Sequence, residues 1–358
     1  MDERRFLLEK QLQQWLGEMV GCSDFTLKSA SGDASFRRYF RVGVNGDSFI
    51  AMDAPPEQED CRPFVAISQA IIDAGLHVPQ VLKKNLEQGF LLLTDLGDQQ
   101  YLGVLNQTTV QSLYSDAMRA LLILQQAQPP RNLLPDYNHD LLMKEMALFL
   151  EWFVSAYLGL KLSPEVQRRL ISIFELLASQ AIVQPQVWVH RDYHSRNLMW
   201  IDKDDIDHSD HSRLFLNPGI LDFQDAVIGP VCYDLVSLLR DCYINWPQQQ
   251  VGDWVEQYRC SLIDAGIIAG TISSAEFLRW FDLMGVQRHL KAIGIFSRLN
   301  IRDNKSGYLQ DIPRTLLYVI QVCRSYHELQ PMYEWLQDAV VPLVMDVLPV
   351  DADYYSTD

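Results

Sequence analysis

The order of short apolar segments predicts an α+β fold with a small antiparallel β lobe followed by a large, mainly helical lobe. Three short segments rich in aromatic and β-branched residues, at 25–30, 36–44 and 47–53, follow one another near the start of the chain. From about residue 108 onward, apolar residues instead recur at helical spacing. We therefore expect an N-lobe at residues 1–95 and a C-lobe at residues 96–358.

The N-lobe is expected to hold a helix, an antiparallel sheet and one inserted helix. Apolar side chains from Phe6 to Met19 recur at helical spacing, so the chain opens with a helix. Asn45-Gly46, between the second and third segments, is a strong hairpin signal. The remaining elements expected here are a helix near 60–74 and strands near 80–84 and 89–95.

The C-lobe is expected to be helical apart from three short strands. The apolar strand 187–189 runs into a polar loop, and 198–201 and 219–221 are the other two strands. The expected helices lie at 108–127, 138–159, 164–181, 231–243, 248–265, 274–300, 308–328 and 331–346.

Composition limits the classes of function. The formal charge of −16 disfavours a nucleic-acid or anionic-membrane surface, although a metal ion can still supply the local positive charge that a nucleotide needs. The six cysteines are scattered without a CxxC pair, which is typical of reduced thiols in a cytosolic protein. The N-terminus has no apolar signal-peptide core, and the apolar stretch 141–162 carries charges. We expect a cytoplasmic protein without a membrane segment or an obligate protein partner.

The densest polar cluster is His190-Arg191-Asp192-Tyr193-His194-Ser195-Arg196-Asn197, between two apolar strands. Its spacing is that of the protein-kinase catalytic loop, H-R-D-x-x-x-x-N. In that loop the Asp accepts the proton of the acceptor hydroxyl and the Asn oxygen is a hard ligand for Mg²⁺. The alternative is a surface turn with incidental polar residues.

A second candidate metal ligand follows an apolar strand further along the chain. Asp222 comes directly after Gly219-Ile220-Leu221 and precedes Phe223. A carboxylate at a strand end can reach a metal while its strand stays buried, as the Asp of the kinase D-F-G motif does. A base and two oxygen ligands are the minimum apparatus of phosphoryl transfer.

These motifs resemble the aminoglycoside phosphotransferase/choline kinase branch of kinase-like enzymes. The resemblance includes the segment that follows them, Gly229-Pro230-Val231-Cys232-Tyr233-Asp234-Leu235. The resemblance implies a protein-kinase-like, two-lobed fold. Within that branch, 52–56, 60–64, 90–97 and 287–291 resemble the bacterial anomeric kinases of N-acetylmuramate and N-acetylglucosamine in peptidoglycan recycling. The likeness covers roughly residues 20–325 and is more specific for the fold than for the sugar.

Carried over by position, the resemblance assigns roles to individual residues. Asp192 is expected to be the catalytic base, and Asn197 and Asp222 to hold Mg²⁺. ATP is expected at a nucleotide-covering hairpin and at the hinge between the lobes. The residues implied there are Ser31, Gly32, Asp33, Ala34, Ser35, Thr94, Asp95 and Leu96. The alternative for the hairpin is a structural turn, and for the hinge an ordinary strand exit.

One position departs from the kinase pattern. Met52 stands where the V-A-I-K motif has its Lys, so the usual Lys–Glu ion pair cannot form. Arg37, Arg38 or Arg41 could supply the positive charge, and strand alternation points Arg38 opposite to the other two. We favour Arg38 as an ATP-binding residue; a solvated strand face is the alternative.

The remaining candidates lie near the loop and in a late helix. His194 is expected to contact the phosphoryl group or to anchor the loop, and Asp234 to bond back to the loop. Arg288, Lys291 and Arg298 recur at spacings of three and seven, so they can share a helix face toward a sugar acid's carboxylate. A solvated face is the alternative.

These expectations combine into one function: an ATP- and Mg²⁺-dependent kinase that phosphorylates the anomeric hydroxyl of an amino sugar. An aminoglycoside or choline-type phosphotransferase is the nearest alternative. A pseudokinase scaffold is an alternative of another class, because Met52 removes the usual Lys. The polar tract 202–213, with its two histidines, is expected to be a variable loop, with a metal-binding tract as the alternative.

Overall fold

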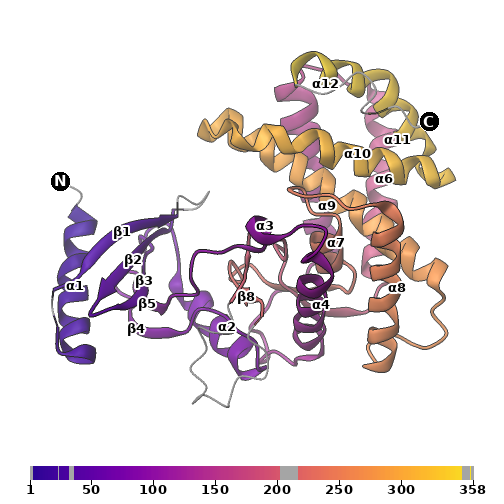
Figure 1. The fold of residues 1–358 in the computed structure, drawn as a ribbon. Helices are drawn as coiled ribbons and strands as arrows, with labels where there is room; N and C mark the ends of the chain where they lie inside the picture. Colours follow the sequence, from indigo (N-terminus) through magenta and orange to yellow (C-terminus); the bar gives the residue numbers. More distant parts are fainter. Residues whose placement is uncertain (1–2, 23, 32–35, 202–216, 349–354, 356–358) are drawn as a thin grey trace. The chain divides into compact units, whose positions relative to one another are not determined.

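The structure is a computed structural model that describes residues 3–22, 24–31, 36–201, 217–348 and 355. It divides into two compact units. The first holds residues 1–124, 129–133 and 196–225, and the second holds 125–128, 134–195 and 226–358. The predicted α+β fold is confirmed, with an antiparallel sheet early in the chain and a mainly helical remainder (Figure 1). The lobe boundary after residue 95 stays a prediction.

A five-stranded antiparallel sheet in the order β1-β2-β3-β5-β4 forms the first part of unit 1. Asn45 and Gly46, with φ of 53° and 94°, make the predicted hairpin between β2 and β3 because both adopt the left-handed backbone that this turn needs. The strands are β1 (Thr26–Ser31), β2 (Arg38–Val44), β3 (Asp47–Asp53), β4 (Val81–Asn85) and β5 (Phe90–Thr94).

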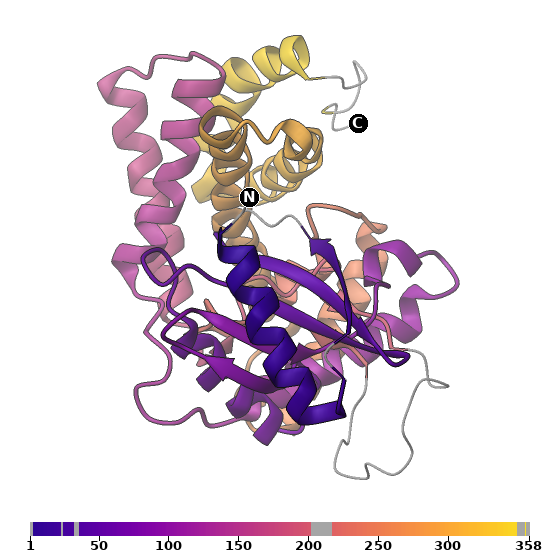
Figure 2. The ribbon, with the colours of Figure 1, turned by 90° about the vertical axis from the view of Figure 1, so that its left-hand side faces the viewer.

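Helix α1 (Glu3–Val20) packs along one face of this sheet (Figure 2). Its buried Leu8, Leu12, Trp15 and Leu16 form a core with the strand residues whose side chains point to the same face. Those strand residues are Phe40, Val42, Val44, Ala51, Phe90 and Leu92. Alternation along the strands therefore assigns Met52, next to Ala51, to the opposite face.

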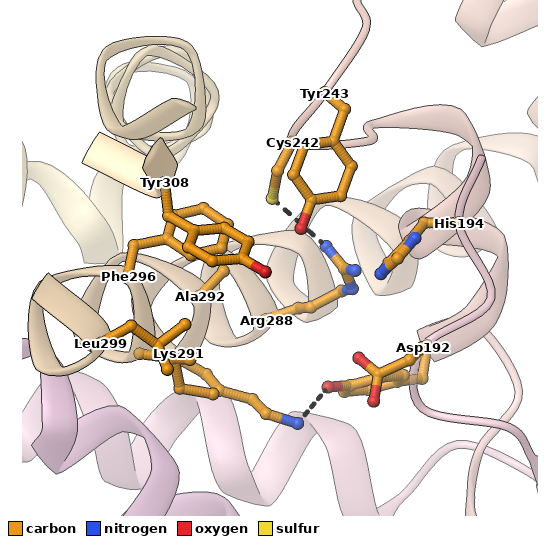
Figure 3. Close-up of a pocket in the computed structure, with 12 residues that line it drawn as sticks. Asp192, His194, Cys242, Tyr243, Arg288, Lys291, Ala292, Phe296, Leu299 and Tyr308 are labelled. Carbon is orange, nitrogen blue, oxygen red and sulfur yellow. Dashed lines mark hydrogen bonds between the residues drawn. The ribbon is translucent and has the colours of Figure 1, made fainter. Parts of the chain in front are cut away.

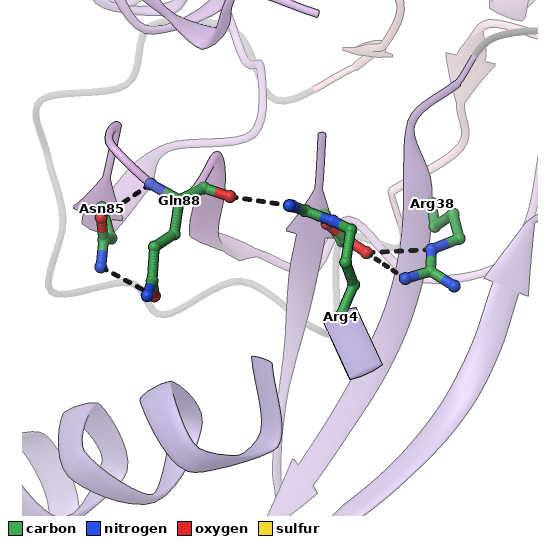
Figure 4. Close-up of polar contacts among 5 residues, drawn as sticks. Arg4, Arg38, Asn85 and Gln88 are labelled. Atoms are coloured by element: carbon green, nitrogen blue, oxygen red, sulfur yellow. Dashed lines mark hydrogen bonds and ion pairs between the residues drawn. The ribbon is translucent and has the colours of Figure 1, made fainter. Parts of the chain in front are cut away.

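A fully buried carboxylate ties α1 to the sheet. Asp53, at the end of β3, accepts hydrogen bonds at 2.9 Å from Nε of Arg4 and from Nε of Arg38 (Figure 4). Arg4 also donates to the carbonyl of Gln88 at 2.8 Å, in the turn between β4 and β5. A buried carboxylate is stable only when it is paired in this way, so the cluster fixes where α1 begins.

The rest of unit 1 places the metal-ligand candidates. A two-stranded ladder joins β7 (Leu198–Met199) to β8 (Gly219–Ile220). A Cβ on Gly219 would lie 2.9 Å from Cδ1 of Leu96, so glycine allows these segments to pack closely. The helices are α2 (Cys61–Asp73), capped by Asp60, then α3 (Tyr101–Val104) and α4 (Val110–Gln126), which ends in unit 2.

Unit 2 is built around one long helix, α9 (Ser274–Asp303), which is buried along most of its length. It contacts α5 (His139–Leu148), the π-helix η1 (Phe149–Tyr157), α6 (Pro164–Ile182), α7 (Tyr233–Leu239) and α8 (Gln248–Asp264). It also contacts the 3-10 helix η3 (Ser306–Asp311) and α10 (Ile312–Ser325). None of the helices that the structure describes has the length and apolarity that crossing a membrane requires.

Three helices differ from their predicted extent. The predicted helix 138–159 becomes a π-helix from Phe149. The predicted 308–328 divides into η3, α10 and the short 3-10 helix η4 (His327–Leu329). The predicted 331–346 divides into α11 (Gln330–Trp335), η5 (Leu336–Val340) and α12 (Val341–Val347).

One strand was not predicted. In the structure, β6 (Gln186–Val189) pairs with β9 (Val227–Pro230). The segment Val227-Ile228-Gly229-Pro230 is short and ends in Gly-Pro, so its sequence alone did not indicate a strand.

Candidate active site

The catalytic loop begins where β6 ends, and its first turn is held by α7. The backbone N–H groups of His190 and Arg191 donate to the two carboxylate oxygens of Asp234, at 2.6 and 3.0 Å. Asp234 is fully buried in the first turn of α7. Two hydrogen bonds to a buried carboxylate fix the loop just before Asp192. The predicted structural role of Asp234 is confirmed.

A second buried carboxylate, which the sequence reasoning missed, holds the loop further on. Asp241 Oδ2 accepts from the backbone N–H of Ser195 at 2.9 Å and from its hydroxyl at 2.5 Å. Its other oxygen accepts from the N–H of Tyr243 at 3.0 Å. Asp192 therefore lies on a loop that is bonded on both sides to buried acids.

Arg191 carries the strained backbone of the loop and a buried ion pair. Its φ is 77°, in the left-handed region that non-glycine residues seldom adopt. Its guanidinium pairs with Glu145 of α5, whose side chain is 7% exposed. Glu145 also pairs with Lys291 of α9 at 3.2 Å and accepts from the hydroxyl of Tyr137. One carboxylate therefore joins the loop to α9.

Asp192 opens onto a cavity of about 140 Å³ within unit 2 (Figure 3). Two cations on successive turns of α9, Arg288 and Lys291, line the same cavity as this carboxylate, together with His194. Aromatic and apolar side chains complete the wall. They are Tyr233, Tyr243, Phe296, Tyr308, Ala292, Ile295 and Leu299, with Cys242 beside them.

The surroundings of Asp192 keep its carboxylate ionised. Burial alone raises the pKa of this carboxyl, but the charges of Lys291, His194 and Arg288 outweigh it, so the pKa lies below its ordinary value of 3.8. The ring of His194 packs edge-on against Tyr243, with centroids 5.2 Å apart. An ionised carboxylate in a partly enclosed, aromatic-lined cavity can accept a proton from a bound hydroxyl.

The two cations differ in their partners. Lys291 pairs with Glu145 at 3.2 Å and donates to the hydroxyl of Tyr233 at 3.1 Å. Burial lowers the pKa of its ammonium, but Tyr233 and Glu145 outweigh this and raise the pKa above its ordinary value. Among the described residues, the hydrogen bond of Arg288 is instead a weak one, from Nη1 to the sulfur of Cys242 at 3.7 Å.

In unit 1, Asn197 and Asp222 lie together because of the β7–β8 ladder. The N–H of Leu221 donates to the carbonyl of Asn197 at 2.9 Å, and Asn197 Nδ2 lies 3.4 Å from Asp222 Oδ2. Asp222 has a φ of 61° and accepts at its other oxygen from Gln224 Nε2 at 2.6 Å. The strand end thus presents carboxylate and amide oxygens, the hard ligands that Mg²⁺ prefers.

These two residues fit a magnesium ion that takes its other ligands from phosphate and water. The described residues contain no group of three or more His, Cys, Asp and Glu side chains that could hold a metal. Mg²⁺ in phosphoryl-transfer sites typically has only one or two protein carboxylates as ligands. A single carboxylate with an adjacent amide therefore suits such an ion better than a transition metal.

Comparison with known proteins places this site in a family. The profile of the phosphotransferase enzyme family matches residues 26–267, more than half of the chain. The chain belongs to the phosphotransferase enzyme family. It is therefore an enzyme, and the alternative of a scaffold without activity is not supported.

Relatives named N-acetylmuramate/N-acetylglucosamine kinase are similar over most of this phosphotransferase. The one from Pseudomonas putida is 45% identical over 313 residues, which are 87% of this chain and 88% of the relative. The one from Neisseria meningitidis is 40% identical over 335 residues, which are 92% of this chain and 95% of the relative.

Solved structures share the fold at low sequence identity. An ADP-bound aminoglycoside phosphotransferase has a TM-score of 0.55 at 15% identity, covering 87% of this chain and 98% of its own. An ethanolamine kinase from Plasmodium vivax has a TM-score of 0.60 at 11% identity, covering 89% of this chain and 93% of its own. The predicted kinase-like fold is thereby confirmed.

At the predicted hinge of the phosphotransferase, hydrogen bonds hold the side chains of Thr94 and Asp95. The N–H and hydroxyl of Thr94 bond to the backbone of Gln80, and Leu96 is buried. Asp95 accepts from Arg41 Nε at 2.6 Å and from the hydroxyl of Ser48 at 2.5 Å. The Asp95 side chain therefore stabilises the predicted hinge. The predicted contacts with adenine would be made by backbone groups of the hinge.

Arg38 lies on the α1 face of the sheet, where it pairs with Asp53 and packs over the ring of Phe40. Its predicted direction, opposite to Arg41, is confirmed by these partners. Met52, at the position of the kinase Lys, is buried on the other face. The ion pair with Asp53 gives Arg38 a structural role, and its predicted role in ATP binding stays a prediction.

One predicted residue is absent from the cavity wall, and another predicted group lies largely outside the described residues. Arg298 is half-buried on α9, and the cavity wall includes Arg288 and Lys291 but not Arg298. Ser31 ends β1, and Gly32, Asp33, Ala34 and Ser35 lie outside the described residues, as does the tract 202–213.

Proposed function

We propose that this phosphotransferase transfers the γ-phosphoryl group of ATP to the anomeric hydroxyl of N-acetylmuramate and N-acetylglucosamine. The observation that carries the proposal is the cavity in which Asp192 lies with Arg288 and Lys291. Relatives at 40–45% identity are named kinases of these two sugars, which supports the same acceptors here.

The charge of the cavity favours this class of acceptor over the alternatives. Aminoglycosides and choline are cationic, so their sites gain from acidic or aromatic walls. The cavity wall has two buried cations, Arg288 and Lys291, and one carboxylate, Asp192. The positive charge of these two cations would repel a cationic acceptor. A neutral sugar or a sugar acid meets no such repulsion, and the aromatic side chains of the wall suit the apolar faces of a sugar ring.

In the proposed reaction, Asp192 is the base. The sugar hydroxyl donates a hydrogen bond to the ionised carboxylate, and its oxygen attacks the γ-phosphorus while its proton passes to Asp192. The bond from the γ-phosphorus to the bridging oxygen of ADP breaks, and the products are a sugar 1-phosphate and ADP. His194, in the wall of the same cavity, is proposed to contact the phosphoryl group.

Asn197 and Asp222 are proposed to hold Mg²⁺, which when bound neutralises charge on the ATP phosphates. The hairpin from Ser31 to Ser35 and the hinge from Thr94 to Leu96 are proposed to bind ATP, and Arg38 to contribute positive charge. The cytoplasmic location and the place of the reaction in peptidoglycan recycling belong to the same proposal.

The test is a panel of acceptors with the purified enzyme. ATP consumption is measured with N-acetylmuramate, N-acetylglucosamine, kanamycin and choline, each with and without Mg²⁺, and phosphorus NMR identifies the product. We expect Mg²⁺-dependent turnover with both sugars and a 1-phosphate product. Turnover with kanamycin or choline alone would refute the proposal.

A pair of variants tests the base. Asp192→Asn should abolish turnover while ATP binding, measured by calorimetry, stays close to that of the wild type. Asp253→Asn, at an exposed position of α8, is the control and should keep full activity. Unchanged turnover in Asp192→Asn would contradict the assigned role.

A further inference from the structure

Arg288 is a buried cation that has no hydrogen bond to a carboxylate in the part of the chain that the structure describes. The residue is 5% exposed, and its Nε has no hydrogen-bond partner among the described residues. Its one polar contact in this part of the chain is the weak one from Nη1 to Cys242 Sγ at 3.7 Å. A guanidinium carries five N–H donors, so most of its hydrogen-bonding capacity is unused.

The neighbouring groups do not neutralise this charge by direct contact. Burial raises the pKa of the Cys242 thiol, which therefore stays uncharged and provides no anion. Lys291, one turn along α9, already has Glu145 at 3.2 Å and the hydroxyl of Tyr233 at 3.1 Å. Of these two cations, Arg288 is therefore the one without a carboxylate at hydrogen-bond distance among the described residues, although Asp192 and Asp241 act on it through their charges.

Buried donors that make no hydrogen bond cost free energy that a bound anion would recover. Arg288 lines the same cavity as Asp192, so an anion bound there belongs to the reacting molecules (Figure 3). Two sources of anion fit this position: a carboxylate on the acceptor or a phosphate of the donor. A planar guanidinium suits either, because it can form two parallel hydrogen bonds.

The wall beyond Arg288 favours the acceptor. Phe296 and Tyr308 stack at 5.6 Å with an interplanar angle of 17°, and both line the cavity with Leu299. Aromatic and aliphatic side chains pack against the apolar face of a sugar ring, whereas a phosphate could use only the tyrosine hydroxyl groups among them. Of the two proposed sugars, N-acetylmuramate carries a lactyl ether that ends in a carboxylate, and N-acetylglucosamine has no charged group.

We propose that Arg288 binds the lactyl carboxylate of N-acetylmuramate and thereby sets the preference of the enzyme between this acid and the neutral sugar. The inference rests on the proposed function. Lys291 already pairs with Glu145, which it shares with Arg191, and is assigned no part in this discrimination.

The first experiment measures kcat/KM for both sugars in the wild type and in Arg288→Met. Loss of a buried, charge-assisted contact should lower the value for N-acetylmuramate by about 10- to 100-fold more than that for N-acetylglucosamine. Arg288→Lys keeps the positive charge but cannot form the two parallel hydrogen bonds of a guanidinium, so its effect on the ratio of kcat/KM values should be intermediate. Arg302→Gln, an exposed position near the end of α9 that pairs with Asp303, is the control and should leave the ratio unchanged.

The second experiment needs no variant and therefore does not depend on how Arg288→Met folds. The wild type is assayed with N-acetylmuramate whose lactyl carboxylate has been converted to an uncharged amide. We expect the same 10- to 100-fold loss of kcat/KM, and no further loss when the amide is given to Arg288→Met.

The outcomes separate the possible failures. An equal fall for both sugars in Arg288→Met would assign Arg288 to the phosphate side and overturn the inference. An unchanged ratio, or full activity of the wild type with the amide, would overturn it as well. A wild type that phosphorylates neither sugar would instead refute the proposed function.

Discussion

Replacing Glu145 by Gln tests the buried charge network that joins the catalytic loop to α9. The carboxylate is 7% exposed and pairs with both Arg191 and Lys291. Gln has the same shape but no charge, so the variant leaves two buried cations without their anion. It also turns an N–H donor toward groups that now donate to the carboxylate, among them Gln287 Nε2 at 3.4 Å.

The expected cost follows from burial. Breaking a buried ion pair by removing one partner typically costs about 3–5 kcal/mol, because the remaining charge stays desolvated. The free energy of unfolding of an ordinary domain is about 5–15 kcal/mol, so the variant should lose a large part of it. Turnover should also fall, because Arg191 holds its strained φ of 77° beside the base only while Glu145 binds its guanidinium.

The assay is urea unfolding followed by circular dichroism, with kcat measured on the same preparations. Glu165→Gln is the matched control, since Glu165 also pairs with an arginine but is 66% exposed. Exposed pairs contribute about 0–1 kcal/mol, so this control should unfold almost as the wild type does. If Glu145→Gln loses less than about 1 kcal/mol of unfolding free energy, the reasoning is refuted, because the buried pair would then contribute no more than an exposed one.

The wild type and Glu145→Gln can also be compared at different pH values. Burial raises the pKa of Glu145, but Lys291 and Arg191 outweigh it, and the pKa in the folded state lies below the ordinary 4.5. A lowered folded-state pKa means that the carboxylate stabilises the protein above pH 4.5 and that this contribution is lost as the pH falls through the folded-state pKa. The stability difference between wild type and Glu145→Gln should therefore shrink below pH 4.5.

Two further predictions concern α9. A Cβ on Gly294 would lie 2.5 Å from the backbone carbon of Leu148, so Gly294→Ala should cost at least about 1–3 kcal/mol in urea unfolding. Gly252→Ala, on α8 with no atom within 4 Å, should be neutral or stabilising, and equal effects would contradict the packing argument. Burial, aided by Arg288, lowers the pKa of His289 to about 3, so the stability of the wild type relative to His289→Gln should fall by up to about 1.4 kcal/mol per pH unit as pH falls from 6.5. Unfolding followed at several pH values checks this, and equal slopes in the two proteins would argue against a buried neutral imidazole.

The sequence could predict those parts of the site that depend on local spacing. Asn197 and Asp222 each adjoin a short apolar strand, and their proximity follows once the two strands pair. Arg288 and Lys291 lie three residues apart on a helix, so the same spacing places both in one cavity wall. Asp234 was predictable because it follows the loop by a motif known from kinase-like enzymes.

Long-range contacts could not be predicted in the same way. Asp241 and Glu145 bond to loop residues 46 positions away in the chain. A signal existed for Glu145, because it falls on the buried stripe of α5 with Leu142 and Met146, where an acid requires a partner. The identity of that partner depends on how α5 packs against the loop, and helical periodicity carries no information about that.

Two predictions show how periodicity can be correct and still incomplete. Strand alternation gave the direction of Arg38 but not its partner, which is Asp53, the residue opposite it in the β2–β3 register. Helical spacing grouped Arg298 with Arg288, yet the cavity wall continues along α9 with Phe296 and Leu299. The extent of a cavity along a helix is set by the neighbouring elements.

The base and the cations of the cavity come from different elements of the chain. Asp192 belongs to a loop held by Asp234 and Asp241, whereas the cations that face it belong to α9. A change of charge on one or two turns of α9 would therefore leave the hydrogen bonds of the loop to Asp234 and Asp241 in place, while it would change the charge that an entering molecule meets and the pKa of Asp192. Arg288→Glu would give the wall an acid where it now has a cation and would raise the pKa of Asp192, so under the proposed roles an exchange of acceptor class on this loop would also need a compensating change around the base.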